Sequence, residues 1–156
     1  MRYVRFLAAI ALAPIAARAY AQQPASPFAP IEFVVGSCWV GTFPEGKQTD
    51  EHCFEWVFDR KFVRDRHVVR GGELYQGETL YDWDAKNKRL AFTYWNSLGM
   101  VMHGDVKSTP QSIVFDQGDG RSTWTRTGPD GYHTLVEQKS GDGWKTLWAM
   151  DFTRKR

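Results

Sequence analysis

The histidines are the first side chains whose chemistry could define a site, because imidazole binds metals and transfers protons near neutral pH. The four are His52, His67, His103 and His133. No two of them have the spacing of metal ligands on a single strand. His52 alternates with Phe54 and Trp56, so it is expected on the same face as these aromatic residues. We therefore predict no metal site and read each histidine as a satisfied polar residue of a strand.

Arginines alternate along residues 62–70, at positions Arg64, Arg66 and Arg70. If their face pointed inward, they would form a cationic patch inside the fold. Burying three guanidinium groups without partners is costly. The pattern therefore favours the opposite orientation, with Val63, His67 and Val69 inward. An intermediate arrangement, with one arginine reaching the interior, remains open at this stage.

Three common catalytic motifs are absent from the chain: the nucleophile elbow, the H-E-x-x-H pair and the P-loop. Its carboxylates show no pairing that calls for a catalytic explanation. We name no catalytic residue and expect a binding function, although a barrel can assemble a catalytic site from separate strands.

Residues 1–21 have the features of a secretory signal peptide. Arg2 and Arg5 precede an apolar run over residues 6–13 that is too short to cross a bilayer, and Ala19-Tyr20-Ala21 is an A-x-A cleavage site. We expect the mature protein to be exported, either periplasmic or secreted, with no transmembrane segment. Three of the 20 Lys and Arg residues lie in this segment and none of the 18 acids does, so the mature chain is nearly neutral. This balance gives no support for nucleic-acid binding.

Residues 22–34 contain several prolines and are predicted to be a flexible lead-in. Residues 35–156 divide into short amphipathic segments separated by turn signals such as Gly128-Pro129-Asp130-Gly131. Strands are predicted over 37–43, 50–58, 62–70, 73–82, 89–96, 100–107, 112–116, 121–127, 132–139 and 144–153. The prediction is an all-β, antiparallel up-and-down β-barrel of about ten strands, because closure removes exposed sheet edges.

The two cysteines, Cys38 and Cys53, are expected to form one disulfide, since an exported chain with an even cysteine count commonly does. A two-residue loop at Glu45-Gly46 would place the two cysteines directly opposite each other on one face. A type I turn with a glycine bulge would offset them by one residue, onto opposite faces. The turn chemistry slightly favours the bulge.

Aromatic residues are abundant, with seven Trp, six Tyr and ten Phe. Strand alternation predicts that six of them share the inward face: Trp56, Tyr81, Phe92, Tyr94, Trp124 and Trp148. Such a set describes a ligand pocket, and it equally describes the filled core of a small barrel. The sequence does not separate these two interpretations.

The segment Gly36-Ser37-Cys38-Trp39-Val40-Gly41-Thr42 resembles the first-strand signature of the calycin superfamily. It is most similar to small bacterial lipocalin-like domains of unknown function, and more distantly to nitrobindin-like barrels. Gly36 and Trp39 are separated by two residues, where the family pattern has one. The resemblance implies that Trp39 plugs the base of the barrel and that Arg154 or Arg156 stacks on its indole.

The resemblance implies a carrier or sensor of a small apolar or amphipathic molecule. The six inward aromatic residues would line the site, and Arg64 or Arg66 would anchor a carboxylate or phosphate head group. One alternative is a haem protein of the nitrobindin type, with His52 or His133 as the candidate ligand, although the final strand lacks the expected histidine. Another is a packed barrel that acts as a structural or interaction domain. No other cofactor is implied.

Overall fold

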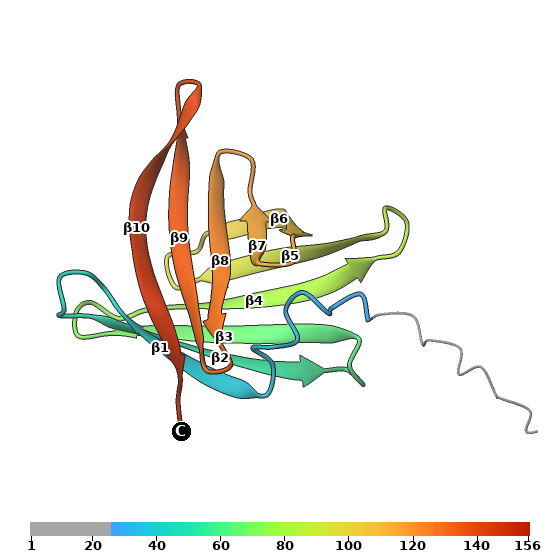
Figure 1. Ribbon diagram of the computed structural model, residues 1–156, viewed down its shortest axis with the longest axis horizontal. Coiled ribbons are helices and arrows are strands. Elements are labelled where there is room, and N and C mark those ends of the chain that lie inside the picture. The colour runs from blue at the N-terminus through green and yellow to red at the C-terminus, as the bar shows by residue number, and fades with distance from the viewer. Residues whose placement is uncertain (1–25) are drawn as a thin grey trace, which may run out of the picture.

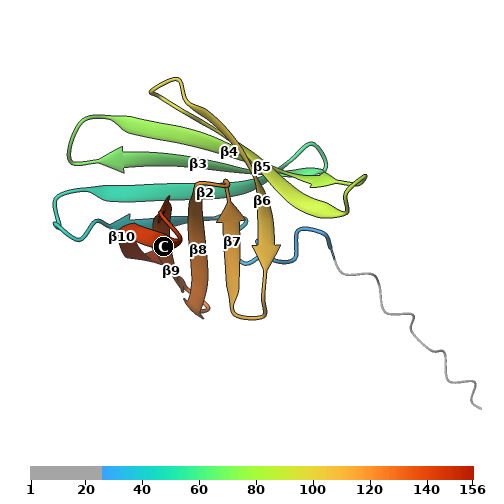
Figure 2. The same ribbon diagram turned by 90° about the horizontal axis from the view of Figure 1, so that it is seen from above.

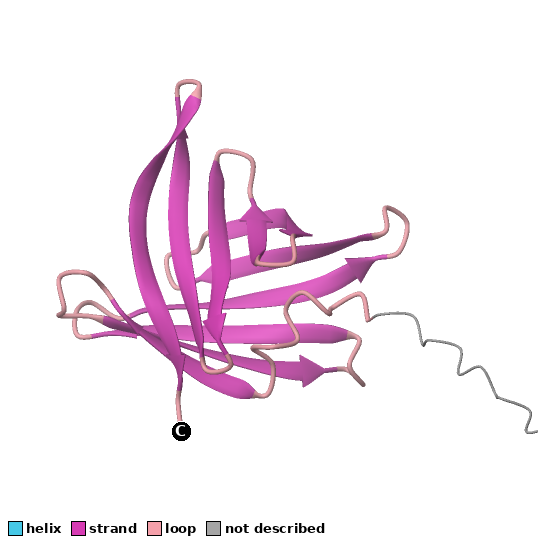
Figure 3. Ribbon diagram, viewed as in Figure 1, coloured by secondary structure: helices cyan, strands magenta, loops and turns pink. Residues whose placement is uncertain are grey.

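The computed structural model describes residues 26–156, which form ten antiparallel strands joined in chain order into a closed barrel (Figures 1 and 3). The predicted signal peptide lies outside the described residues. The strands are β1 (Ser37–Thr42), β2 (Thr49–Val57), β3 (Phe62–Arg70), β4 (Tyr75–Asp84), β5 (Arg89–Asn96), β6 (Val101–Ser108), β7 (Ser112–Asp116), β8 (Gly120–Gly128), β9 (Gly131–Ser140) and β10 (Gly143–Arg154). The predicted fold class is confirmed. Within the described part of the chain, no helix has the length and apolar character needed to cross a bilayer.

The barrel closes where β1 pairs with β10 as well as with β2. Closure brings strands from distant parts of the chain to face one another, with β2–β4 running across the direction of β8–β10 (Figure 1). Figure 2 shows β2–β5 and β7–β9 on opposite sides of the interior. Successive side chains of each strand alternate between the interior and the outer face.

One end of the barrel, here called the closed end, is covered by residues 26–36, which form a series of turns. Phe28, Ile31 and Val34 of this segment are only 5%, 0% and 0% exposed, and they belong to the hydrophobic core. The sequence predicted a flexible lead-in over residues 22–34. Within residues 26–34 the structure differs from this prediction, because Phe28, Ile31 and Val34 fill the end of the barrel and pack into its core; residues 22–25 lie outside the described part.

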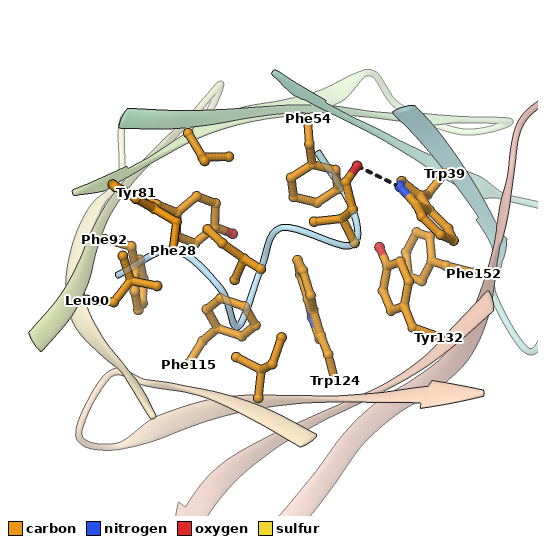
Figure 4. Close-up of a cluster of buried hydrophobic side chains, with 14 of the residues drawn as sticks. Phe28, Trp39, Phe54, Tyr81, Leu90, Phe92, Phe115, Trp124, Tyr132 and Phe152 are labelled. Atoms are coloured by element: carbon orange, nitrogen blue, oxygen red, sulfur yellow. Dashed lines mark hydrogen bonds between the residues drawn. The ribbon is translucent and has the colours of Figure 1, made fainter. Parts of the chain in front are cut away.

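Trp39 joins this covering segment to the barrel wall. Its side chain is fully buried, and its indole nitrogen donates a 3.0 Å hydrogen bond to the carbonyl of Val34 (Figure 4). The guanidinium carbon of Arg154 lies 4.7 Å from the centre of the Trp39 ring. Arg154 also donates hydrogen bonds to the carbonyls of Phe33 and Pro129. The contact that the resemblance implied for Arg154 is therefore present.

Cys38 and Cys53 form the predicted disulfide on the outer face of the first hairpin. The two residues are directly opposite in register, with their Cα atoms 4.0 Å apart. The hairpin loop spans residues 44–47, and the amide of Phe43 donates to the carbonyl of Gln48 across its base. A four-residue loop preserves the same pairing as a two-residue loop, so the bulged register that the turn chemistry favoured is wrong.

Replacing both cysteines by serine should lower the free energy of unfolding by about 3 kcal/mol, because a cross-link over 15 residues restricts the unfolded chain. Urea unfolding of the wild type and of the Cys38→Ser/Cys53→Ser variant would measure this difference. A reductant should destabilise the wild type and leave the double variant unchanged. Equal sensitivity of the two proteins to reductant would contradict a stabilising disulfide.

Candidate functional site

Six of the predicted ligand-binding residues lie in or against the core. Tyr81, Phe92 and Trp124 are 3%, 4% and 6% exposed and are packed among other aromatic rings (Figure 4). Trp56, Tyr94 and Trp148 are partly buried and pack against this cluster. The structure thus brings the predicted aromatic residues to one interior, although ligand binding by them stays a prediction.

The two predicted anchors, Arg64 and Arg66, lie on the outer face of β3, away from the aromatic residues. Both approach the same carboxylate oxygen of Glu55, at 2.6 and 3.3 Å respectively. Val63 and His67 occupy the interior at 0% and 7% exposure. The orientation favoured by the cost of burying arginine is confirmed, so these side chains do not reach into the barrel.

A buried charged triad, formed by Asp50, His52 and Asp65, occupies the interior between β2 and β3. His52 donates from Nδ1 to Asp65 at 2.8 Å and from Nε2 to Asp50 at 3.1 Å. Asp50 and Asp65 are only 4% and 2% exposed. The sequence analysis missed Asp50 and Asp65. Their alternation with His52 and His67 on two strands joined by a tight turn was the available signal.

A second chain of hydrogen bonds leads from this triad toward the end of the barrel that residues 26–36 do not cover. His67 Nδ1 donates to the other oxygen of Asp50 at 3.0 Å, and His67 Nε2 lies 3.0 Å from the Tyr94 hydroxyl. The Tyr94 hydroxyl lies 2.6 Å from the Tyr75 hydroxyl. The Tyr75 hydroxyl accepts a 3.1 Å hydrogen bond from the side-chain amide of Asn96. Polar side chains from four consecutive strands therefore form one continuous network.

Gly77 makes room for this network. It is directly opposite His67 in register. A Cβ atom at Gly77 would lie 2.5 Å from His67 Nε2 and 2.6 Å from the Tyr94 hydroxyl. A larger residue at this position would therefore displace the groups that connect the two halves of the network.

The surroundings of His52, Asp50 and Tyr94 strongly shift the pKa values of these three groups. Burial alone would lower the pKa of His52, but the charge of Asp65 and the hydrogen bonds to both carboxylates raise it to about 10. Burial alone would raise the pKa of Asp50, but hydrogen bonds from His52 and His67 hold it well below the usual range. Burial and the contact with Tyr75 raise the pKa of Tyr94 above its ordinary value. His52 therefore carries its proton at neutral pH.

Asp50, His52 and His67 are the residues that offer metal-ligand geometry inside the barrel, with ligand atoms within 4.8 Å of one another. In the structure, however, all four of the ring nitrogens involved are hydrogen-bonded, three of them to carboxylates. His133 of β9, the other haem candidate, is hydrogen-bonded to Asp151 of β10, and both side chains are exposed. Neither His52 nor His133 presents a free nitrogen to the interior.

The end opposite the closed end, here called the open end, is bordered by the hairpins β1–β2, β3–β4, β5–β6, β7–β8 and β9–β10. The interior near the closed end is fully packed around Trp39 and Tyr132, both at 0% exposure, although Trp83 at the rim of that end is 38% exposed. Toward the open end, Val69 is 7% exposed, but five other inward-facing side chains are only half-buried. These five are the mouth residues: Phe43, Tyr75, Tyr94, Met102 and Trp148. The aromatic packing is therefore tighter around Trp39 and Tyr132 than among the mouth residues.

No protein-family model and no curated protein sequence matches this chain significantly.

The triad should make stability depend on pH. Because the folded-state pKa of His52 is raised from 6.5 to about 10, its stabilisation is complete below about pH 6.5 and is lost as the pH rises toward 10. Because the pKa of Asp50 is lowered from 3.8, its stabilisation is present above that pH and is lost in acid. The free energy of unfolding should therefore be greatest between about pH 4 and 6.5 and fall by a few kcal/mol toward pH 10.

Urea unfolding across this pH range would test the prediction, with His52→Gln as the variant and His133→Gln as the matched control on the surface. The His52 variant should be less stable and should lose the decline above pH 6.5, whereas the His133 variant should change by less than about 1 kcal/mol. A wild-type profile that stays flat up to pH 10 would show that the triad is not ionised as described.

Proposed function

We propose that the protein is an exported carrier or sensor that binds a small amphipathic molecule at the open end of its barrel. The observation that carries this proposal is the change along the interior, from sealed aromatic packing to the half-buried mouth residues. A barrel with a purely structural interior gains by burying such side chains completely. Aromatic side chains left half-exposed around a few polar groups are typical of a small-molecule site.

The mouth residues offer two kinds of contact. The rings of Phe43 and Trp148 lie 5.6 Å apart at an angle of 65°, and with Met102 they provide apolar surface. Tyr75 and Tyr94 provide hydroxyl groups that the network behind them holds in place. An amphipathic ligand would place its apolar part against the former and its polar group on the tyrosines. This arrangement replaces the arginine anchor expected from the sequence.

The proposal includes membership of the calycin-type barrels and export from the cytoplasm. The stacking of Arg154 on the Trp39 ring supports calycin-type membership, because the resemblance to that superfamily implies this contact. The disulfide supports the second, since such bonds persist in oxidising compartments. The densely packed closed half favours a competing function, an interaction domain with no ligand, which the following experiment distinguishes.

Native mass spectrometry of the protein purified from its own compartment should reveal a bound mass in one-to-one ratio. Tryptophan fluorescence should respond to fatty acids or similar amphiphiles and saturate at the same ratio. Trp148→Ala should weaken binding by about tenfold or more, since it removes a large apolar contact. Trp83→Ala, at the closed end, is the control and should leave the affinity unchanged.

Tyr94→Phe separates the polar from the apolar contribution. It removes one hydroxyl from the mouth and should weaken binding of amphiphiles while sparing purely apolar probes. If no bound mass is found and no amphiphile changes the fluorescence of the wild type, the carrier function is wrong and the interaction domain takes its place.

A further inference from the structure

The β5–β6 hairpin carries an unusual concentration of exposed apolar side chains. Trp95, Leu98, Met100 and Val101 are 42%, 75%, 45% and 52% exposed. Residues 90–104 contain no Asp, Glu, Lys or Arg. Exposed apolar clusters of this kind usually mark a contact surface in a soluble protein.

The β3–β4 turn extends this surface. The amide of Ser97 donates to the carbonyl of Gln76 at 2.9 Å, and the amide of Gln76 donates to the hydroxyl of Ser97 at 3.3 Å. These bonds hold the beginning of β4 against the β5–β6 turn, so Leu74, which is 68% exposed, lies next to the hairpin. We call Leu74, Trp95, Leu98, Met100 and Val101 together the apolar tip.

A polar cleft of about 570 Å³ adjoins the apolar tip on the outer face of β2–β5 and shares Trp95 with it. Four charged residues line this cleft: Glu51, Arg66, Arg70 and Glu78. Glu51 is paired with Lys155 and Arg66 with Glu55. No ion pair engages Arg70 or Glu78 among the residues that the structure describes. The cleft thus offers one free cation and one free anion beside an indole ring.

We propose that the apolar tip and the adjoining cleft dock the protein onto a bilayer of zwitterionic phospholipid. Arg70 complements the phosphate of the head group, while Glu78 and the face of Trp95 complement its ammonium group. The part of the hairpin formed by residues 90–104, which contains no Asp, Glu, Lys or Arg, enters the boundary between head groups and acyl chains, where tryptophan is favoured.

A second copy of the chain fits this surface less well. A standard protein interface uses about 20–30 residues on each side, whereas the apolar tip has five. A strongly anionic membrane also fits less well, because the charges of Arg70 and Glu78 in the cleft balance each other and residues 90–104 of the hairpin contain no Lys or Arg. Docking at the open end would bring the mouth residues near the lipid, but the proposal does not depend on a ligand being bound there.

Flotation with phosphatidylcholine and phosphatidylethanolamine vesicles tests this proposal. The wild type should float with the vesicles, and raising the salt from about 0.05 to 0.5 M should weaken binding only several-fold, since the charge contacts of the cleft are screened whereas apolar insertion is not. Leu98→Asp should weaken binding by about tenfold or more. Phe58→Asp is the matched control, because Phe58 is equally exposed, at 72%, on the β2–β3 turn at the opposite end.

Two further variants test the cleft separately. Arg70→Ala and Glu78→Gln should each reduce binding several-fold and leave the fold intact, as judged by circular dichroism. Trp95→Phe should remove the fluorescence quenching caused by lipids brominated near the head group.

The proposal is overturned if the wild type does not float with zwitterionic vesicles, or if binding needs anionic lipid and disappears at high salt. It is equally overturned if Leu98→Asp and Phe58→Asp behave alike. Size-exclusion chromatography with light scattering would measure the oligomeric state. A wild-type dimer that the Leu98→Asp substitution dissociates would show that the apolar tip binds a second copy of the chain, and would overturn the proposal.

Discussion

Closure of the sheet between β1 and β10 is the constraint on which the rest of the structure depends. β1 has six residues, and it must pair on both sides to close the barrel. Gly41 leaves room for the core side chains of β10 at this junction, because a Cβ atom there would lie 2.6 Å from Met150 Sδ and 3.1 Å from the ring of Phe152. Trp39 sits on the same short strand and is held from both directions, by Val34 of the covering segment and by Arg154 of β10. Closing the barrel and sealing its end are therefore coupled.

Closure also determines which side chains must share the interior. Asp50, Asp65 and His67 alternate with outward residues on β2 and β3, so their side chains point into the closed barrel, where their polar groups need hydrogen-bond partners. Breaking such a buried arrangement by removing one partner costs more than the arrangement itself contributes. Apolar residues could fill the same space. What the charged network adds is orientation, because it holds the hydroxyl of Tyr94 at the boundary between the sealed and open halves.

The two ends of the barrel differ in chemistry as a consequence. The closed end is covered by a segment from outside the sheet, and the interior there is packed with aromatic side chains. The open end has no such segment among the described residues, and its inward-facing side chains stay half-exposed while the hairpin beside it carries apolar groups outward. Ligand binding inside the mouth and lipid contact on its rim are separate proposals, but both follow from the same asymmetry between the ends.

The sequence by itself determined the ten strands and the disulfide. Both depend on local signals, namely period-2 alternation, turn residues and cysteine count in a chain with a predicted signal peptide. It also indicated that the arginines of β3 face outward, because burying three guanidinium groups without partners is costly. Only the tertiary structure decided that Asp65 and His52 meet, that Ile31 belongs to the core, and that the open end remains accessible. These features depend on register between strands and on closure; alternation along β2 and β3 indicates which side chains share a face, but not which of them become hydrogen-bond partners.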